Sequence, residues 1–417
     1  MNYTESVEYV HSRLKFGIKP GLERIEKLCA LLGNPQNQLK FVHVAGTNGK
    51  GSICSMIASV CQAAGLRTGL FVSPYVVDFR ERITLNGQYI PKRDFSRIMT
   101  KIAPLADTIE EITEFEVLTA AAFLWFAKKK CDIVVLEVGL GGRFESTNII
   151  TSPACSVIAK IALDHTKILG DTISQIAIEK CGIIKKNCPV VTYPEQDIDA
   201  LSVIMEQTSC KESKLYKPNS NAVKMLDESI DGSRFSYGGS EFFVPFPGYH
   251  QIYNALTAIQ VAKVLNFTDE IIADGLKNAK MPARTQIISK KPLIMVDGSH
   301  NPNGLCALSE LLKKHLSNKK LIFVMGMLAD KSVDEAASFV LPLADKVLCV
   351  TPDNPRAMPA AEFAETAKKY CNDVIIPSGT FDACKKSVDL CPDVGAVICC
   401  GSLYLAGDIL KSFDKIL

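Results

Sequence analysis

The sequence predicts an α/β protein in which strands and helices alternate along the chain in two successive series. Short apolar runs of strand length recur between longer helical segments, and this alternation is typical of mostly parallel sheets. A glycine-rich turn joins the first of these strands to the next helix. A break at 281–292, rich in proline and lysine, separates the first series from the second.

Length and composition fit a globular protein of two or three domains. The chain has 417 residues, of which 47% are hydrophobic and 22% charged, so large cores are expected and global disorder is not. The 47 basic residues nearly balance the 45 acidic ones, for a net charge of +2. This balance argues against nucleic acid or an anionic membrane as a partner held by overall charge.

The fifteen cysteines are scattered and form no C-x-x-C pair, which predicts reduced, buried thiols rather than a zinc or disulfide framework. The first residues carry charges and no apolar stretch, so no signal peptide is expected. No apolar run approaches the roughly 20 residues of a membrane span. These features together predict a soluble cytoplasmic protein.

The first series is expected to form an ATP-binding P-loop domain over residues 1–283. Its expected strands are 41–45, 66–72, 132–138, 155–160 and 189–193, and helical periodicity covers 4–33, 53–64, 114–128 and 173–184. Residues 213–247 contain short β-like pieces and turn residues, which predict a hairpin-rich appendage. Helices at about 249–265 and 268–279 close this domain.

Residues 284–292 are expected to be a hinge linker, and 293–417 a second doubly wound, Rossmann-like domain. Its expected strands are 293–296, 320–324, 346–350, 374–376 and 396–400, with helices at about 303–316, 332–342, 360–371, 380–390 and 402–415.

The glycine-rich turn reads GTNGKGS at 46–52. Small residues let backbone N–H groups point at phosphates, a lysine reaches the β- and γ-phosphates, and a hydroxyl serves Mg²⁺. Lys50 supplies the amine, and Thr47 or Ser52 the hydroxyl. The spacing differs from a standard Walker A motif, but the strand before the turn and the helix after it disfavour a purely structural turn.

Polar residues also follow other expected strands. Glu137 ends a buried strand and precedes a glycine-rich turn, so it points into the crevice where such sheets bind ligands. A Mg²⁺ ligand is its natural role, against the alternative of an exposed loop glutamate. His165, beside Asp164, and the Asp297–Asn301 cluster occupy equivalent places. Two such crevices indicate a site between the domains.

Taken together, these segments resemble the folylpolyglutamate synthase/dihydrofolate synthase branch of the Mur ligase family nearly end to end. The matching segments include FGIKPGLERI (16–25), VAGTNGKGS (44–52), SPYVVDFRERI (73–83), LEVGLGGRFESTN (136–148), LDHTKILGDTISQIAIEKCGI (163–183), PARTQ (282–286), DGSHNPNG (297–304), GMLADKS (326–332) and CGSLYLAG (400–407). The irregular glycine spacing is itself this family's pattern. The resemblance implies a Mur-ligase-like two-domain architecture.

The implied activity is ATP-dependent addition of L-glutamate to the carboxylate of tetrahydrofolate. The carboxylate attacks the γ-phosphate to give an acyl phosphate, and the amine of glutamate then displaces phosphate. The implied cofactors are ATP and Mg²⁺ at two sites, while a monovalent cation stays undecided. The implied partners are reduced folate, L-glutamate and ATP, with no nucleic acid or membrane, for a monomeric enzyme. Whether dihydropteroate is also a substrate stays open.

The resemblance also assigns roles to individual residues. It places ATP phosphates at Thr47, Asn48, Gly49, Lys50, Gly51 and Ser52, and nucleotide contacts at Asn254, Arg284 and Asp297. It places metal ions at Ser73, Glu137, His165 and Lys180, the last as a carbamate that ligates Mg²⁺. It places the incoming glutamate near His300 and Ser402, and the pterin and a neighbouring loop near Arg82, Phe115 and Glu116. Lys50, Glu137, His165, Lys180 and His300 form the expected catalytic set.

Departures from the family pattern occur at Tyr75, where the family often has histidine, at Ser299 and at Met281–Ala283. The change at Tyr75 affects a loop over the folate site. The competing interpretations are a peptidoglycan-precursor ligase, a P-loop ATPase switch or kinase, and a non-catalytic folate binder. The segments 32–36 and 400–407 favour folate, and the second α/β domain disfavours a switch or kinase.

Overall fold

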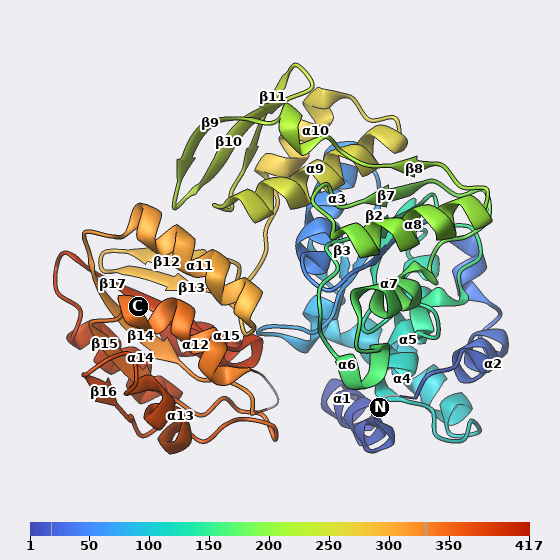
Figure 1. The fold of residues 1–417 in the computed structure, drawn as a ribbon. Helices are drawn as coiled ribbons and strands as arrows, with labels where there is room; N and C mark the ends of the chain where they lie inside the picture. Colours follow the sequence, from blue (N-terminus) through green and yellow to red (C-terminus); the bar gives the residue numbers. More distant parts are fainter. Residues whose placement is uncertain (18, 330–331) are drawn as a thin grey trace.

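The computed structural model describes residues 1–17, 19–329 and 332–417. Figure 1 shows two lobes, one built from the blue-to-yellow part of the chain and the other from the orange-to-red part. Asp330 and Lys331, in the family-like segment 326–332, lie outside the described residues, as does Ile18 in 16–25. The α/β class expected from the sequence is confirmed.

An eight-stranded sheet forms the centre of the first lobe, in the order β4-β3-β2-β5-β1-β6-β7-β8. The strands are β1 Phe41–Ala45, β2 Thr68–Phe71, β3 Ile83–Leu85, β4 Gln88–Tyr89, β5 Ile133–Glu137, β6 Cys155–Ile158, β7 Val190–Thr192 and β8 Leu215–Tyr216. Neighbours from β2 to β8 pair in parallel, whereas β3 and β4 are antiparallel at one edge. The carboxyl ends of β1 and β5 are therefore adjacent, with Val44 opposite Glu137.

Helices cover both faces of this sheet, because alternate side chains of each strand point to opposite sides. Phe41 belongs to the core formed with α1, α2, α4 and α5, whereas Val42 and Val44 belong to the core formed with α3, α9 and α10. The helices are α1 Tyr3–His11, α2 Glu23–Leu31, α3 Lys50–Ala63, α4 Lys92–Ala106, α5 Glu114–Lys128, α6 Thr166–Leu169, α7 Ile173–Cys181, α8 Ile198–Cys210, α9 Tyr249–Val264 and α10 Asp269–Lys277.

The expectation of helical structure throughout 4–33 is wrong in its middle. After α1 the chain forms a 3-10 turn over Ser12–Phe16, and α2 begins only at Glu23. Gly17 has φ +63°, a left-handed conformation that ends the turn. The structure also adds β3, β4, α4 and α8, which the sequence analysis does not assign.

The hairpin-rich appendage expected at 213–247 is confirmed for 224–244, whereas β8 at the start of that range belongs to the eight-stranded sheet. A three-stranded antiparallel sheet comprises β9 Lys224–Ser229, β10 Gly232–Tyr237 and β11 Ser240–Val244. Phe235, Phe242 and Val244 anchor it in the core of the first lobe. In Figure 1 its β9–β10 end points toward the second lobe.

The second lobe is a six-stranded sheet in the order β12-β13-β17-β14-β15-β16. Its strands are β12 Gln286–Lys290, β13 Leu293–Val296, β14 Lys320–Met325, β15 Lys346–Cys349, β16 Val374–Ile375 and β17 Gly395–Cys400, and its helices are α11 Pro302–His315, α12 Val333–Val340, α13 Ala360–Ala367, α14 Thr380–Asp389 and α15 Leu403–Phe413. The segment 284–292, expected as a linker, contains β12, which pairs antiparallel with β13 at the sheet edge. The other neighbours are parallel.

None of the helices within the described parts of the chain is both long and apolar enough to cross a lipid bilayer.

Candidate functional site

The glycine loop lies between β1 and α3, and backbone contacts hold it against the chain that follows β6. The amides of Thr47 and Asn48 donate to the carbonyl of Lys160 at 2.8 and 3.1 Å, and the Thr47 hydroxyl donates to the carbonyl of Ala162 at 3.0 Å. Ser52, in the first turn of α3, is buried. The loop backbone is therefore fixed where helix N–H groups are available for phosphates.

Gly49 is the point where α9 touches this loop. It has φ +83°, and a Cβ there would lie 2.4 Å from Oδ1 of Asn254. Asn254 is buried, and its Nδ2 donates to Oε1 of Gln251 at 3.1 Å. Only glycine therefore fits this position. Asn254, which is expected to contact the nucleotide, lies directly against the loop.

Two lysines meet at the start of the loop. Nζ of Lys50 donates to the carbonyl oxygen of Gly46 at 3.1 Å, and Nζ of Lys180 donates to the same oxygen at 2.9 Å. Lys180 is buried, and burial, reinforced by the charge of Lys50, lowers its pKa to about 7. Near neutral pH, the Lys180 amine is therefore neutral and nucleophilic in a large fraction of the molecules.

Glu137 lies at the carboxyl end of β5, beside the loop. Its Oε2 accepts the amide of Ser73 at 3.0 Å, and a Cβ on Gly51 would lie 3.8 Å from the same oxygen. Burial raises the pKa of Glu137, while Lys50, the Ser73 amide and Arg284 oppose that rise. The site thus joins Glu137, Ser73 and Gly51 with the charges of Lys50 and Arg284.

His165 occupies the turn before α6 in a left-handed conformation, φ +51°. Its amide donates to Oδ1 of Asp164 at 2.9 Å, and its Nε2 lies 3.8 Å from Oδ2 of the same residue. The imidazole is about half exposed. The turn therefore presents His165 at the surface with Asp164 as its neighbour.

The residues expected at the metal sites provide a partial ligand set. Across the described residues, no group of three or more His, Cys, Asp and Glu side chains could hold a metal ion. Mg²⁺ commonly takes one or two carboxylates and completes its shell with phosphates and water. Glu137, beside Ser73 and the phosphate loop, fits that pattern, and a carbamate on Lys180 would add a further carboxylate.

The second lobe brings its predicted residues together on two adjacent loops. The carboxylate of Asp297 accepts the amides of Thr285 and Ser299, each at 2.8 Å. Nδ1 of His300 lies 2.9 Å from the carbonyl of Gly298. The amide of Gly401 donates to the carbonyl of Ser299 at 2.9 Å, which ties the loop of His300 to the loop before α15.

Ser402 has a structural task in this arrangement. Its hydroxyl accepts the amides of Tyr404 and Leu405 at 3.2 and 3.5 Å and caps α15. The side chain is buried. Its contribution to a ligand site therefore comes from fixing the start of α15.

A cavity of about 1040 Å³ lies between the lobes, lined by Gly51, Ser73, Glu137, Arg284 and Leu403 among others. Across the gap, Nδ2 of Asn301 donates to Oδ1 of Asn48 at 3.5 Å. The phosphate loop of one lobe thus faces the start of α11 in the other.

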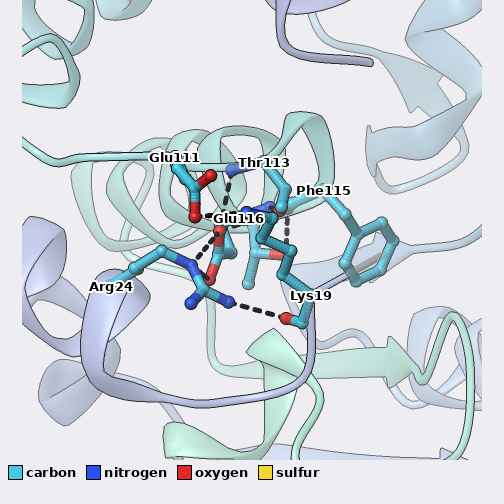
Figure 2. A network of polar contacts seen from close by, with 7 residues as sticks. Lys19, Arg24, Glu111, Thr113, Phe115 and Glu116 are labelled. Carbon is cyan, nitrogen blue, oxygen red and sulfur yellow. Dashed lines mark hydrogen bonds and ion pairs between the residues drawn. The ribbon is translucent and has the colours of Figure 1, made fainter. Parts of the chain in front are cut away.

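A polar network surrounds the start of α5 (Figure 2). The carboxylate of Glu116 accepts the amide and hydroxyl of Thr113, each at 2.8 Å, in a capping box. Nε of Arg24 donates to both oxygens of Glu116 at 3.0 and 3.2 Å, and its Nη2 donates to the carbonyl of Lys19. Lys19 in turn pairs with Glu111. Glu116 is therefore held by structural partners rather than directed at solvent.

Phe115 and Arg82 are the other two residues expected near a pterin. The ring of Phe115 lies against Gly139, where a Cβ would approach it to 2.9 Å. Gly139 belongs to the turn after Glu137, so Phe115 supports that turn. The guanidinium of Arg82 lies 5.4 Å from the ring centre of Tyr75 and 5.8 Å from that of Phe79. Its Nε is buried without a hydrogen-bond partner.

The structure adds a residue that the sequence analysis does not single out. Glu145 is partly buried: Thr147 donates to its Oε2, and its Oε1 is enclosed without a hydrogen-bond partner. Burial raises the pKa of Glu145 to about 7. Its place as an acidic residue in the glycine-rich segment 136–148 is the sequence feature that could have identified Glu145. Asn301, already part of the Asp297–Asn301 cluster expected from the sequence, also contacts the other lobe.

Comparisons with known proteins agree with this geometry. Residues 44–262 match the Mur ligase middle domain, and 283–403 match the Mur ligase glutamate ligase domain. The chain is 35% identical to the dihydrofolate synthase/folylpolyglutamate synthase of Bacillus subtilis, over 98% of each chain.

Two solved structures resemble the whole chain. One is the Mycobacterium tuberculosis folylpolyglutamate synthase complexed with ADP and AMPPCP, with 28% identity, a TM-score of 0.88 and 99% of each chain covered. The other is the bifunctional folylpolyglutamate synthase/dihydrofolate synthase with Mn, AMPPNP and L-glutamate bound, with 29% identity, a TM-score of 0.85 and 99% and 98% covered. The chain therefore belongs to the Mur ligase family of ATP-dependent ligases, in its folylpolyglutamate synthase/dihydrofolate synthase branch.

Proposed function

We propose that this protein adds L-glutamate to the carboxylate of tetrahydrofolate at the expense of ATP. The observation that carries the proposal is the position of Glu137, buried beside Gly51 of the phosphate loop and at the wall of the cavity between the lobes. A buried carboxylate next to a phosphate-binding loop is repelled by phosphate unless cations lie between them. That requirement fits a nucleotide bound together with a divalent metal.

The loop residues Thr47, Asn48, Gly49, Lys50, Gly51 and Ser52 are proposed to bind the phosphates through backbone amides and the Lys50 amine. Asn254, Arg284 and Asp297 are proposed to contact the rest of the nucleotide. Arg284 is close enough to Glu137 to oppose the rise of its pKa, and both residues line the cavity, so its guanidinium also lies near the proposed phosphates. The cavity lets both lobes contribute to one site.

Ser73, Glu137, His165 and Lys180 are proposed to hold divalent metal at two sites. The relative solved with Mn and AMPPNP supports a divalent ion in such a protein. When bound, the metal neutralises charge on the phosphoryl oxygens. Lys180 contributes as a carbamate: its neutral amine adds to CO₂, the new N–C bond forms, and one proton leaves. The lowered pKa of Lys180 favours the neutral amine that this addition needs.

The reaction proceeds in two displacements. An oxygen of the folate carboxylate attacks the γ-phosphorus, the bond to ADP breaks, and an acyl phosphate forms. The amine of L-glutamate then attacks the acyl carbon, loses a proton and displaces inorganic phosphate. Lys50 and Arg284 offset the negative charge that develops on the phosphoryl group. The two lobes shield the acyl phosphate from water.

His300 is proposed to face the incoming glutamate, with Ser402 fixing the neighbouring loop. Arg82 and Phe115 are proposed to contact the folate, and Glu116 to hold the start of α5 beneath them. We also propose the division into domains at 1–283 and 293–417, a monomeric state and a cytoplasmic location.

Incubation of the protein with ATP, Mg²⁺, L-glutamate and a panel of acceptors tests the activity. Equal amounts of ADP and of acceptor carrying one added glutamyl group are expected with tetrahydrofolate. Dihydropteroate alone in the same assay decides whether dihydrofolate is also made. A phosphorylated acceptor would instead identify a kinase, and ADP release without any modified acceptor would identify an ATPase switch.

A further inference from the structure

The β9–β10 turn of the first lobe makes a set of contacts with the second lobe, and its Ile230 and Asp231 lie at the wall of the cavity between the lobes. Glu228 in β9 forms an ion pair with Lys314, and Nε2 of His315 lies 3.4 Å from Oε1 of Glu228. Ile230 packs against the core of the second lobe. Asp231 pairs with Lys290 in β12 at 3.0 Å. We call Glu228, Lys314 and His315 the clasp.

Within the clasp, Glu228 and His315 are largely buried and Lys314 is half exposed, whereas both partners of the neighbouring ion pair are exposed. The side chain of Glu228 is 6% exposed and that of His315 is 13% exposed. Asp231 and Lys290 are 54% and 70% exposed. Burial disfavours the Glu228 carboxylate, but Lys314 and His315 outweigh burial and hold its pKa below the ordinary value. Losing one partner of a buried pair is costly, whereas an exposed pair contributes little.

Lys314 and His315 form the last turn of α11, and the first turn of the same helix faces the active site. Asn301 caps the start of α11 through the amide of Gly304 at 2.9 Å, and donates to Asn48 of the phosphate loop. A helix of 14 residues is about 20 Å long. Helix α11 therefore touches the first lobe at both of its ends.

We propose that Glu228 is a positioning residue: the clasp holds the far end of α11 so that its near end, with His300 and Asn301, is aligned on the phosphate loop. A helix fixed at one end only can pivot, and the lobe that carries it can then turn away. Fixing both ends sets the orientation of the second lobe before substrates arrive. The role at the glutamate site rests on the proposed function.

The test compares Glu228→Gln with Asp231→Asn, which removes the exposed charge of the same turn. Without nucleotide, Glu228→Gln is expected to have a larger radius of gyration by small-angle X-ray scattering than the wild type, because more molecules are open. Its KM for L-glutamate should rise at least about fivefold while kcat changes less than about twofold, since only the aligned population binds well. Asp231→Asn should match the wild type in both measurements.

Lys314→Met provides a second variant, because the half-exposed amine of Lys314 tolerates removal better than buried Glu228. It should show the same changes in scattering and KM, to a smaller degree, and it decides the question if Glu228→Gln does not fold. Clasp variants that match Asp231→Asn in scattering and in KM would overturn the inference while leaving the ligase activity established. A wild-type protein that modifies no acceptor would contradict the proposed function, and the scattering comparison would still decide whether the clasp sets the orientation of the lobes.

Discussion

Lys50 and Lys180 direct both of their amines at one acceptor, the carbonyl oxygen of Gly46, at 3.1 and 2.9 Å. Two ammonium groups so close together repel each other, and burial adds to the cost at Lys180. The cost is relieved if one amine is neutral or becomes a carbamate. In the proposed mechanism, Lys50 keeps its positive charge for the phosphates, and a carbamate on Lys180 supplies an oxygen ligand for the metal.

Replacing Lys180 by alanine should reduce ligase activity about 100-fold, since a lost metal ligand or its support typically costs that much. Short carboxylic acids such as acetate should restore part of the activity by placing a carboxylate where the carbamate stood. The same acids should leave the wild-type rate unchanged. Steady-state rates with and without acetate provide the measurement, and full activity in Lys180→Ala would remove the carbamate from the mechanism.

Gly49→Ala should weaken ATP binding and destabilise the fold by about 2 kcal/mol or more, because the new methyl group meets Asn254 at 2.4 Å in a left-handed backbone. Gly65→Ala is the matched control: Gly65 has φ +79° and no atom within 4 Å of the added Cβ. It should lose only about 1 kcal/mol and bind ATP normally. Nucleotide titration and denaturant unfolding measure both effects, and equal ATP affinities would contradict the tight contact.

Arg24→Met should destabilise the protein by about 3 kcal/mol, because it leaves the buried Glu116 carboxylate without its ion pair. The start of α5 should loosen and the KM for folate should rise, while the KM for ATP stays unchanged. Lys19→Met breaks the more exposed pair with Glu111 in the same network (Figure 2) and should cost less than about 1 kcal/mol. A similar loss of stability in both variants would show that burial of Glu116 is not the decisive factor.

The buried side chain of His43 is expected to make the stability of the first lobe sensitive to acid. The imidazole is fully buried, with Nε2 2.8 Å from Oγ1 of Thr147, and burial, helped by Lys185, lowers its pKa to about 3. Between an unfolded pKa near 6.5 and this value, the unfolded chain binds a proton that the folded chain does not. Stability therefore falls as the pH drops through this range.

In the variant His43→Gln, the unfolded chain has no imidazole at this position to take up that proton. The free energy of unfolding of the wild type, measured by urea denaturation at pH 6 and pH 4.5, should decline more steeply than that of His43→Gln, by up to about 1.4 kcal/mol per pH unit. Equal slopes in the two proteins would show that His43 is protonated in the folded state.

The alternation of apolar runs was sufficient to predict the central parallel strands of both sheets, because strands buried on both faces leave a strong signal in the sequence. The break at Gly17 was not predictable from periodicity, since helical spacing continues on both sides of it. Strand β12 was missed because an edge strand tolerates polar residues such as Lys290. Its identity depends on pairing with β13.

The candidate site also combines features that the sequence predicted with features that only the tertiary structure reveals. Strand ends and glycine spacing pointed to Glu137 and the phosphate loop, whereas the convergence of Lys50 and Lys180 on Gly46 is a tertiary feature. The Thr113-x-x-Glu116 spacing is a capping-box signature, a signal for the structural role of Glu116 that was not used when the residue was expected near the pterin. No local pattern marks Glu228, because it matters only through partners in the other lobe. The Asp297–Asn301 cluster marks Asn301, but not its contact with Asn48.

The central claim is that a folate carboxylate becomes an acyl phosphate before it is joined to glutamate. It is tested most directly with tetrahydrofolate carrying ¹⁸O in its reactive carboxylate, incubated with the protein, ATP, Mg²⁺ and L-glutamate. If the carboxylate attacks the γ-phosphorus, one ¹⁸O atom is transferred to each inorganic phosphate released. Inorganic phosphate without ¹⁸O, released together with ADP, would show that water attacks ATP and would contradict the ligase mechanism.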